Sequence, residues 1–281
     1  ADYPAAPAPD GSALLAVSVT GEGQELAERM VLLAPDGSAT HVGPISARVR
    51  GPSWSPDGRW IVFESDTASF RDLYRMNRDG SGLRRLTHDP EGNFEPAVSP
   101  DGRWIAFVSS RDGDSEVYVM RADGSEPRRI TAFHRDDWGP RWSPDGRRIA
   151  FLSNRESVDR VFVVGADGTE LRRLDPAAPD TMHAEADPAW SPDGVRLALT
   201  VRTRGGVSRV AVHDLRTGTR TFVSAPGERA SMPAWSPDGR HLVYVAERAD
   251  DADLRIVRAD GSAGSTIVRS PGPDWLPRWV P

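Results

Sequence analysis

Three of the six histidines, His88, His134 and His183, lie in polar segments outside the strand-like runs of the chain. His183 is followed by Glu185 and Asp187 at alternate positions, so in an extended segment these three side chains share one face. Imidazoles beside carboxylates can hold a divalent metal or act as general acid and base. The histidines are therefore metal candidates, and His134, His183 and Glu185 are catalytic candidates; solvated loop residues are the alternative.

Aromatic and charged residues form a second candidate set. Phe94, Trp138 and Trp275 stand at corresponding places in three related segments, and they could stack on a sugar, a peptide or a planar ligand. Glu95 follows Phe94 and is a further catalytic candidate. The predicted ligand-binding residues are Arg50, Phe94, Glu95, Trp138, Asp187 and Trp275. The competing interpretation is that the aromatic rings only cap packed sheets.

Composition excludes several classes of protein. With 0 Cys, neither a disulfide nor a thiolate site can form. A net charge of −6 argues against a nucleic-acid partner, and no apolar run is long enough for a transmembrane segment. The Gly-x-Ser-x-Gly hydrolase motif and phosphate-binding glycine loops are absent from the sequence. The start at Ala1, without Met, favours an exported, periplasmic or extracellular protein over a cytoplasmic one.

A repeat of roughly 45 residues must position these groups. The motif Trp-Ser-Pro-Asp-Gly, with Val replacing Trp in the second copy, occurs five times and has a partial copy at 9–11. Its aspartates are Asp10, Asp57, Asp101, Asp145, Asp193 and Asp238. A turn-forming role is predicted for them, because the carboxylate can accept backbone N–H groups while glycine permits the turn.

Each repeat predicts four strands. A short apolar run rich in β-branched and aromatic residues follows Pro-Asp-Gly, as in 60–63 and 149–152. An alternating run comes next and ends at Asp-Gly, a tight-hairpin signal, as at 79–80 and 123–124. Short runs such as 83–87 complete the unit. The repeated Trp is expected to pack between neighbouring sheets.

This pattern resembles the WD40-like (PD40) repeat of the TolB family, and the resemblance extends over nearly the whole chain. It implies an all-β fold, a six-bladed β-propeller with four-stranded blades, in a single domain of residues 1–281. Residues 277–281 match residues 140–144 almost position for position, which predicts that a C-terminal strand closes the N-terminal blade. Closure removes open sheet edges.

Loops that lead into the inner strands of a propeller gather at one mouth of its central channel, where the candidate residues would converge. The first functional hypothesis is a stand-alone binding module for a protein or a small molecule at this mouth. The second is a lyase, isomerase or cyclase that uses the same loops. No cofactor is predicted under the first hypothesis, and a divalent metal belongs to the second.

Overall fold

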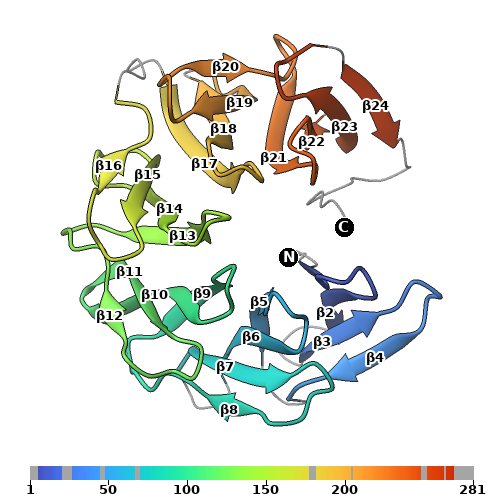
Figure 1. Ribbon diagram of the computed structural model, residues 1–281, viewed down its shortest axis with the longest axis vertical. Coiled ribbons are helices and arrows are strands. Elements are labelled where there is room, and N and C mark those ends of the chain that lie inside the picture. The colour runs from blue at the N-terminus through green and yellow to red at the C-terminus, as the bar shows by residue number, and fades with distance from the viewer. Residues whose placement is uncertain are drawn as a thin grey trace. The chain divides into compact units, whose positions relative to one another are not determined.

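The computed structural model describes residues 6–20, 27–44, 48–66, 70–176, 182–203, 205–247, 252–262 and 264–268. Within these ranges the secondary structure consists of β-strands, which form six four-stranded antiparallel sheets in chain order (Figure 1). These sheets are the blades of a six-bladed β-propeller, as the repeat predicts. No helix in the described residues could cross a membrane. The chain divides into two compact units, one of Ala1–Trp142 with Val280–Pro281 and one of Ser143–Trp279.

Short strands separated by tight turns make up the blades of the first unit. The first blade has β1 (Ala6–Pro7), β2 (Leu14–Thr20), β3 (Ala27–Leu33) and β4 (Ala39–Val42). The second has β5 (Val49–Trp54), β6 (Trp60–Ser65), β7 (Asp72–Asn77) and β8 (Arg84–Arg85). The third has β9 (Asn93–Val98), β10 (Trp104–Asp112), β11 (Asp114–Arg121) and β12 (Arg128–Arg129), and β13 (Asp137–Trp142) follows.

The second unit continues the same order. It contains β14 (Arg148–Ser153), β15 (Arg160–Gly165) and β16 (Arg172–Arg173), which share the fourth sheet with β13. The fifth blade has β17 (Met182–Trp190), β18 (Arg196–Thr203), β19 (Ser208–Asp214) and β20 (Arg220–Phe222). The sixth has β21 (Arg229–Trp235), β22 (His241–Glu247), β23 (Ala252–Arg258) and β24 (Gly264–Val268).

The repeated motif forms the turn between the first and second strands of a blade. In the second blade, Asp57 Oδ1 accepts from Ser55 Oγ at 2.6 Å and from the Arg59 N–H at 3.1 Å. Ser55 Oγ in turn accepts the Trp60 N–H at 3.0 Å. Hydrogen bonds from Ser55 and Arg59 hold the pKa of Asp57 below its ordinary value. The predicted turn-forming role of the motif aspartate is confirmed.

The motif tryptophan joins a blade to the inner strand of the preceding one. Trp142 Nε1 donates to the Ala97 carbonyl at 2.9 Å, and Trp235 Nε1 donates to the Ala189 carbonyl at 3.0 Å. Trp235 is buried in an apolar cluster with side chains of both its own and the preceding blade. The indole N–H thereby keeps a partner inside the core, which a buried Trp needs.

In the first blade, the described strand beside β2 comes from the N-terminal segment of the chain. The two-residue strand β1, from the N-terminal segment, pairs with β2 through Ala6↔Leu15 and Pro7↔Leu14. Trp54 Nε1 bonds to the Ala6 carbonyl at 3.0 Å, as the motif tryptophans do elsewhere. The predicted closing strand at 277–281 lies outside the described residues, so its role stays a prediction.

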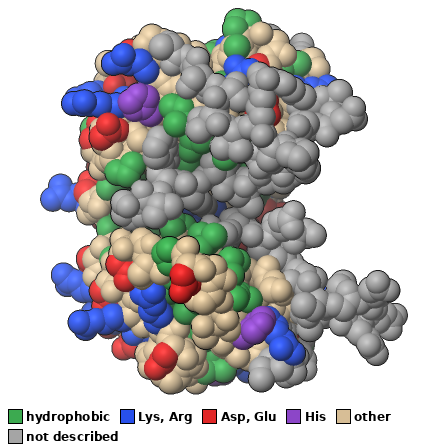
Figure 2. Space-filling view, turned by 90° about the vertical axis from the view of Figure 1, so that its right-hand side faces the viewer, with side chains coloured by type: hydrophobic (Ala, Val, Ile, Leu, Met, Phe, Trp, Pro, Cys, Tyr) green, Lys and Arg blue, Asp and Glu red, His purple; other side chains and the backbone are tan. Residues whose placement is uncertain are grey.

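Charges on the surface are mixed. On the described part of the face in Figure 2, arginine and acidic side chains are interspersed, and they form no continuous basic patch there. Every cation of this kind is arginine, because the chain has no lysine. Interspersed charge of this kind keeps exposed strand edges from pairing with other chains.

Candidate functional site

A β-bulge interrupts the inner strands at a residue-proline pair, shifting the register of strand pairing in β5, β9, β17 and β21. The residue before proline has a positive φ of 51–65°. These residues are Gly51, Glu95, Gly139, Asp187 and Met232. Glycine adopts this conformation easily, whereas other L-residues lose about 1–2 kcal/mol. Non-glycine residues here are strained, and strain of this kind is common at functional sites.

Glu64 holds the bulge of the third blade. This side chain, at the end of β6, is 4% exposed, and its Oε1 accepts the Glu95 N–H at 2.7 Å. Burial raises the pKa of the Glu64 carboxyl, while the Glu95 N–H and Arg71, whose Nη1 lies 3.6 Å from Glu64 Oε2, oppose that rise. A Cβ on Gly51 would lie 2.8 Å from Glu64 Oε1, so glycine makes room for the carboxylate.

The next link runs from β9 to β13. Glu95 is exposed, and its Oε2 accepts the Gly139 N–H at 2.6 Å. Trp138, the residue before Gly139, is half-buried. Glu64, beside Gly51 of β5, therefore binds the bulge of β9, and Glu95 of β9 binds the Gly139 N–H of β13. Glu95 thereby fixes the backbone that carries Trp138.

Two guanidinium groups and a ring lie beside these carboxylates. Arg71 is placed 5.1 Å over the Phe94 ring, and a Cβ on Gly92 would lie 2.5 Å from Phe94 Cζ. Arg50 Nη2 lies 3.5 Å from Glu28 Oε1, and the positive charge of Arg50 also reaches Glu64. The first unit thus brings together Arg50, Phe94 and Glu95 of the predicted site, with Trp138 attached through the Gly139 link.

Asp187 belongs to a separate group in the second unit. Its Oδ2 accepts from Thr200 Oγ1 at 2.7 Å and lies 3.4 Å from the Met232 backbone nitrogen, which donates to Thr200 Oγ1 at 3.1 Å. Thr200 occupies the strand position that Glu64 occupies in the second blade. The Thr200 hydroxyl therefore accepts the N–H of the bulge residue, and it donates its own hydrogen to Asp187.

Glu185 lies inside a buried ionic cluster. The residue is 1% exposed; its Oε2 accepts the Val161 N–H at 2.8 Å, and its Oε1 pairs with Arg220 at 2.6 Å. Arg220 Nε lies 3.1 Å from Asp175, which lies 4.0 Å from His213 Nδ1. Burial, then Arg220, lowers the pKa of His213. These contacts give Glu185 a structural role between strands.

The histidine candidates do not form a cluster in the described part of the chain. His88 and His134 are exposed, and the His134 ring stacks on Phe133 with centroids 4.3 Å apart. The backbone of His183 lies in β17, but its side chain is outside the described set, and so is Trp275. Among the described residues, no group of three His, Asp or Glu could hold a metal ion. The predicted metal site includes His183, whose side chain lies outside the described residues, so the metal stays a prediction.

Glu64 and Arg71 are site residues that the sequence interpretation missed. A signal was available for Glu64, because an acid ends the otherwise apolar run 60–63, where the equivalent positions hold Val108, Leu152 and Thr200. Such an acid is buried with its strand and needs a donor partner. Arg71 has no comparable signal, since it stands in a loop that varies between repeats.

Known proteins share this sequence pattern and fold. The sequence model of PD40, described as TolB beta propeller domain, matches residues 88–185 and 181–281. An uncharacterized protein of Agrobacterium fabrum is 37% identical over 60 residues, which cover 21% of this chain and 20% of that protein.

Among solved structures, TolB from Acinetobacter baumannii has a TM-score of 0.65 at 24% identity, covering 92% of this chain and 61% of its own. An oligogalacturonate lyase in complex with manganese has a TM-score of 0.74 at 16% identity, covering 94% of this chain and 75% of its own. A puromycin-hydrolyzing peptidase of Mycobacterium tuberculosis has a TM-score of 0.69 at 19% identity, covering 90% of this chain and 44% of its own. At these identities the likeness shows the fold alone.

Proposed function

From the premise that this chain belongs to the PD40 family of TolB beta propeller domains, we propose that it is a binding module for a protein or a small molecule. The ligand-contacting residues are Arg50, Phe94, Glu95 and Trp138, in the inner-strand loops of the first unit. One observation carries the proposal: Glu64, a buried carboxylate, holds Glu95 in a strained positive-φ conformation beside Phe94. Strain kept in this way favours a role in presenting side chains.

The chemistry of these loops suits a ligand with both apolar and polar parts. Phe94 and Trp138 are half-buried rings that offer stacking surfaces, and Arg50 and Arg71 supply positive charge. Glu95 keeps one carboxylate oxygen beyond the one bonded to Gly139. A peptide with an aromatic and an acidic residue, or a sugar with an acidic group, fits this combination.

A panel of defined peptides and oligosaccharides, followed by thermal shift and calorimetry, tests the proposal. A probe that binds the natural chain should bind Phe94→Ala and Trp138→Ala at least about tenfold more weakly. Phe70→Ala is the matched control, because Phe70 is an exposed aromatic residue, 50% exposed, outside these loops. If the two loop variants lose stability but bind the probe as before, the rings are caps of packed sheets and the proposal fails.

A second candidate, an enzyme of lyase type, has one observation in its favour. The carboxyl of Glu64 has a raised pKa and lies near Arg71 and Arg50, an arrangement suited to proton transfer beside an anion. Turnover of oligogalacturonate, measured with and without manganese, would support it, provided that Glu64→Gln abolishes the activity. Full activity in Glu64→Gln would exclude this role for Glu64.

An exported location is also proposed. Fractionation of cells that express the gene from its own start would test it, and recovery in the periplasmic or extracellular fraction is expected. Recovery only in the cytoplasmic fraction would contradict it.

A further inference from the structure

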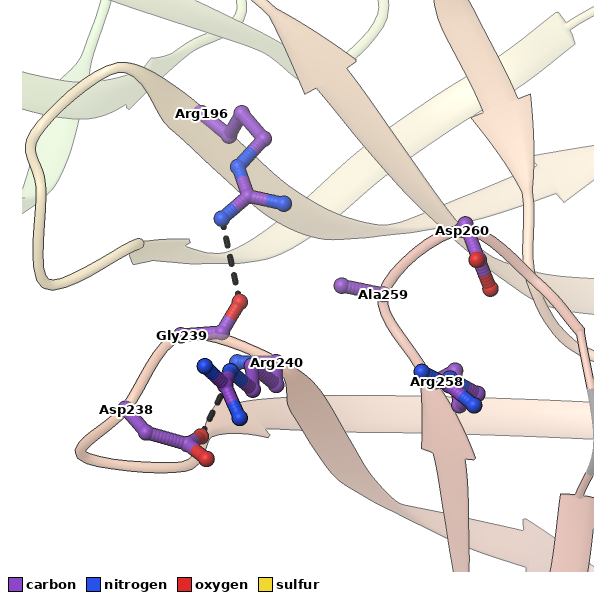
Figure 3. A pocket seen from close by; sticks show the side chains of 7 residues that line it. All are labelled: Arg196, Asp238, Gly239, Arg240, Arg258, Ala259 and Asp260. Carbon is purple, nitrogen blue, oxygen red and sulfur yellow. Dashed lines mark hydrogen bonds between the residues drawn. The ribbon is translucent and has the colours of Figure 1, made fainter.

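A surface pocket of about 380 Å³ lies in the second unit and shares no residue with the site proposed in the first. Figure 3 shows its residues on three segments: Arg196 at the start of β18, the turn before β22, and the turn after β23. Its lining residues are Arg196, Asp238, Gly239, Arg240, Arg258, Ala259 and Asp260. A volume of this size is in the range of small-molecule sites.

One of the three arginines is already engaged. Arg196 Nη2 donates to the Gly239 carbonyl at 3.0 Å, its guanidinium lies 4.6 Å over the Trp235 ring, and Asp193 is 3.5 Å away. Arg196, in the fifth blade, therefore connects that blade to the sixth. It makes one wall of the pocket rigid.

Arg240 and Arg258 have no such role. Within the described ranges, neither side chain forms a hydrogen bond or an ion pair; the bond between Arg240 and Asp238 uses the Arg240 backbone N–H, at 3.0 Å. Hydrogen bonds, chiefly from Ser236 and Ser262, lower the pKa of Asp238 and Asp260, so both carboxylates are ionised at neutral pH. Because Arg196 already lies 3.5 Å from Asp193, the lining offers two uncommitted arginines beside two aspartates.

The fourth and fifth blades make the same inter-blade contact without arginines at the positions of Arg240 and Arg258. There Arg148 Nη2 donates to the Gly194 carbonyl at 2.7 Å and lies 4.9 Å over Trp190, as Arg196 does in its own pair. The positions that correspond to Arg240 and Arg258 hold Val195 and Asp214. The correspondence is structural, because the Leu215 N–H bonds to the Val195 carbonyl at 3.0 Å and the Ala259 N–H bonds to the Arg240 carbonyl at 2.9 Å.

We propose that this pocket binds a small hydroxylated carboxylate of single negative charge. Arg240 and Arg258 would receive the carboxylate, since guanidinium donors match the two oxygens of such a group. Asp238 and Asp260 would accept hydrogen bonds from the hydroxyl groups through Oδ2, because each uses Oδ1 for its own turn. The two aspartate carboxylates disfavour an anion that has no hydrogen-bond donors or that carries more than one negative charge.

Calorimetry of the full chain with D-gluconate tests this proposal at fixed ionic strength. Saturable binding is expected, and sorbitol, which lacks the carboxylate, and butyrate, which lacks the hydroxyls, should bind at least about tenfold more weakly. The double variant Arg240→Gln/Arg258→Gln should lose gluconate binding by a similar factor. Arg121→Gln is the matched control, because Arg121 has the same repeat position as Arg258 but pairs with Glu126 at 2.8 Å.

Four results would overturn the proposal. They are no saturable gluconate binding, equal binding by the double variant, sorbitol or butyrate as tight as gluconate, and inorganic phosphate as tight as gluconate. The double variant should melt at the temperature of the natural chain, since Arg240 and Arg258 are exposed and form no hydrogen bond or ion pair within the described ranges. None of these results depends on Phe94 or Trp138, so the test is separate from that of the first-unit site.

Discussion

The third blade, in the first unit, and the fifth blade, in the second, carry residues of opposite charge at one equivalent strand position. Both blades nevertheless supply an acceptor for the buried N–H of the following residue. In the third blade, Glu116 is fully buried, accepts from Thr131 Oγ1 at 2.5 Å and pairs with Arg129 at 2.5 Å. In the fifth, the equivalent residue is Arg209, which donates to the Ser224 carbonyl at 2.9 Å. The shared feature is the hydroxyl: Thr131 accepts the Val117 N–H at 2.9 Å, and Ser224 accepts the Val210 N–H at 3.1 Å.

The fourth blade explains why the hydroxyl matters. Asp175 replaces it there, and the corresponding N–H, that of Val161, is accepted by Glu185 of the next inner strand instead. A buried N–H must have an acceptor. The hydroxyl position can therefore hold a different side chain only where another group accepts that N–H. What the repeats share is therefore an accepted N–H, while the charge of the neighbouring residue is free to change.

Removing the acid of the third blade should have the largest effect. Glu116→Ala leaves Arg129, Thr131 and the Phe133 N–H without their buried partner, and we expect a loss of about 3–5 kcal/mol in the free energy of unfolding. Arg209→Ala should cost only about 1–2 kcal/mol, because it removes one half-buried hydrogen bond and the contact of the guanidinium with the Phe222 ring, 4.2 Å from its centroid. Urea unfolding of both variants measures the difference.

Equal losses in the two variants would show that the charged residue, and not the hydroxyl, is the shared structural element. Thr131→Val tests the hydroxyl, because the substitution keeps the shape but removes both the acceptor of the Val117 N–H and the donor to Glu116 Oε2. Its loss should exceed that of Ser224→Ala, which removes the acceptor of the Val210 N–H, by about 1 kcal/mol.

Substitution of Gly51 tests the bulges of the first unit. Gly51→Ala places a Cβ 2.8 Å from the buried Glu64 Oε1 at a φ of 53°, so backbone strain and displacement of the carboxylate should together cost about 2–3 kcal/mol. Gly218→Ala in the second unit has a similar φ, 70°, but no atom within 4 Å of the new Cβ. It should lose only the strain, about 1–2 kcal/mol. Identical chemical-denaturation midpoints would mean that Glu64 moves aside freely.

The two acceptors of bulge N–H groups should differ in their response to pH. Because the folded-state pKa of Glu64 is raised, its contribution to stability is present below the ordinary value of 4.5 and is lost as pH rises through the folded-state pKa. Glu64→Gln keeps a carbonyl acceptor without the charge, so it should be more stable than the natural chain at neutral pH and lose that advantage in acid. Thermal melts across this pH range measure the difference.

Thr200→Val is the second-unit counterpart. The hydroxyl itself does not titrate, and its removal takes away both the bond from the Met232 N–H and the bond to Asp187 Oδ2, so it should cost about 2 kcal/mol at neutral pH. A pH-independent effect of Glu64→Gln would show that the buried carboxyl is not the titrating group.

The sequence predicted the regular parts of the molecule better than its special ones. Six blades, the Asp57-type turns and the Trp235-type contacts follow from a repeat, because the same residues recur wherever the same backbone recurs. The grouping of Arg50, Phe94 and Glu95 could be expected from their equivalent places. The burial of Glu185 could not, since its partners, the Val161 N–H and Arg220, come from segments far away in the chain.

The smallest expected effect concerns strain at the bulges themselves. Met232 has a φ of 55°, and its backbone N–H, not its side chain, makes the bonds to Asp187 and Thr200. Met232→Gly relieves about 1–2 kcal/mol of strain but gives the unfolded chain about 0.5–1 kcal/mol of additional entropy, so a net gain of at most about 1 kcal/mol is expected. Glu95→Gly relieves the strain of a φ of 51°, but it also removes the carboxylate that accepts the Gly139 N–H. It should therefore be destabilising. The difference between the two substitutions in urea unfolding measures that carboxylate link, and a difference of zero would show that the exposed Glu95 bond contributes nothing to the first-unit bulges.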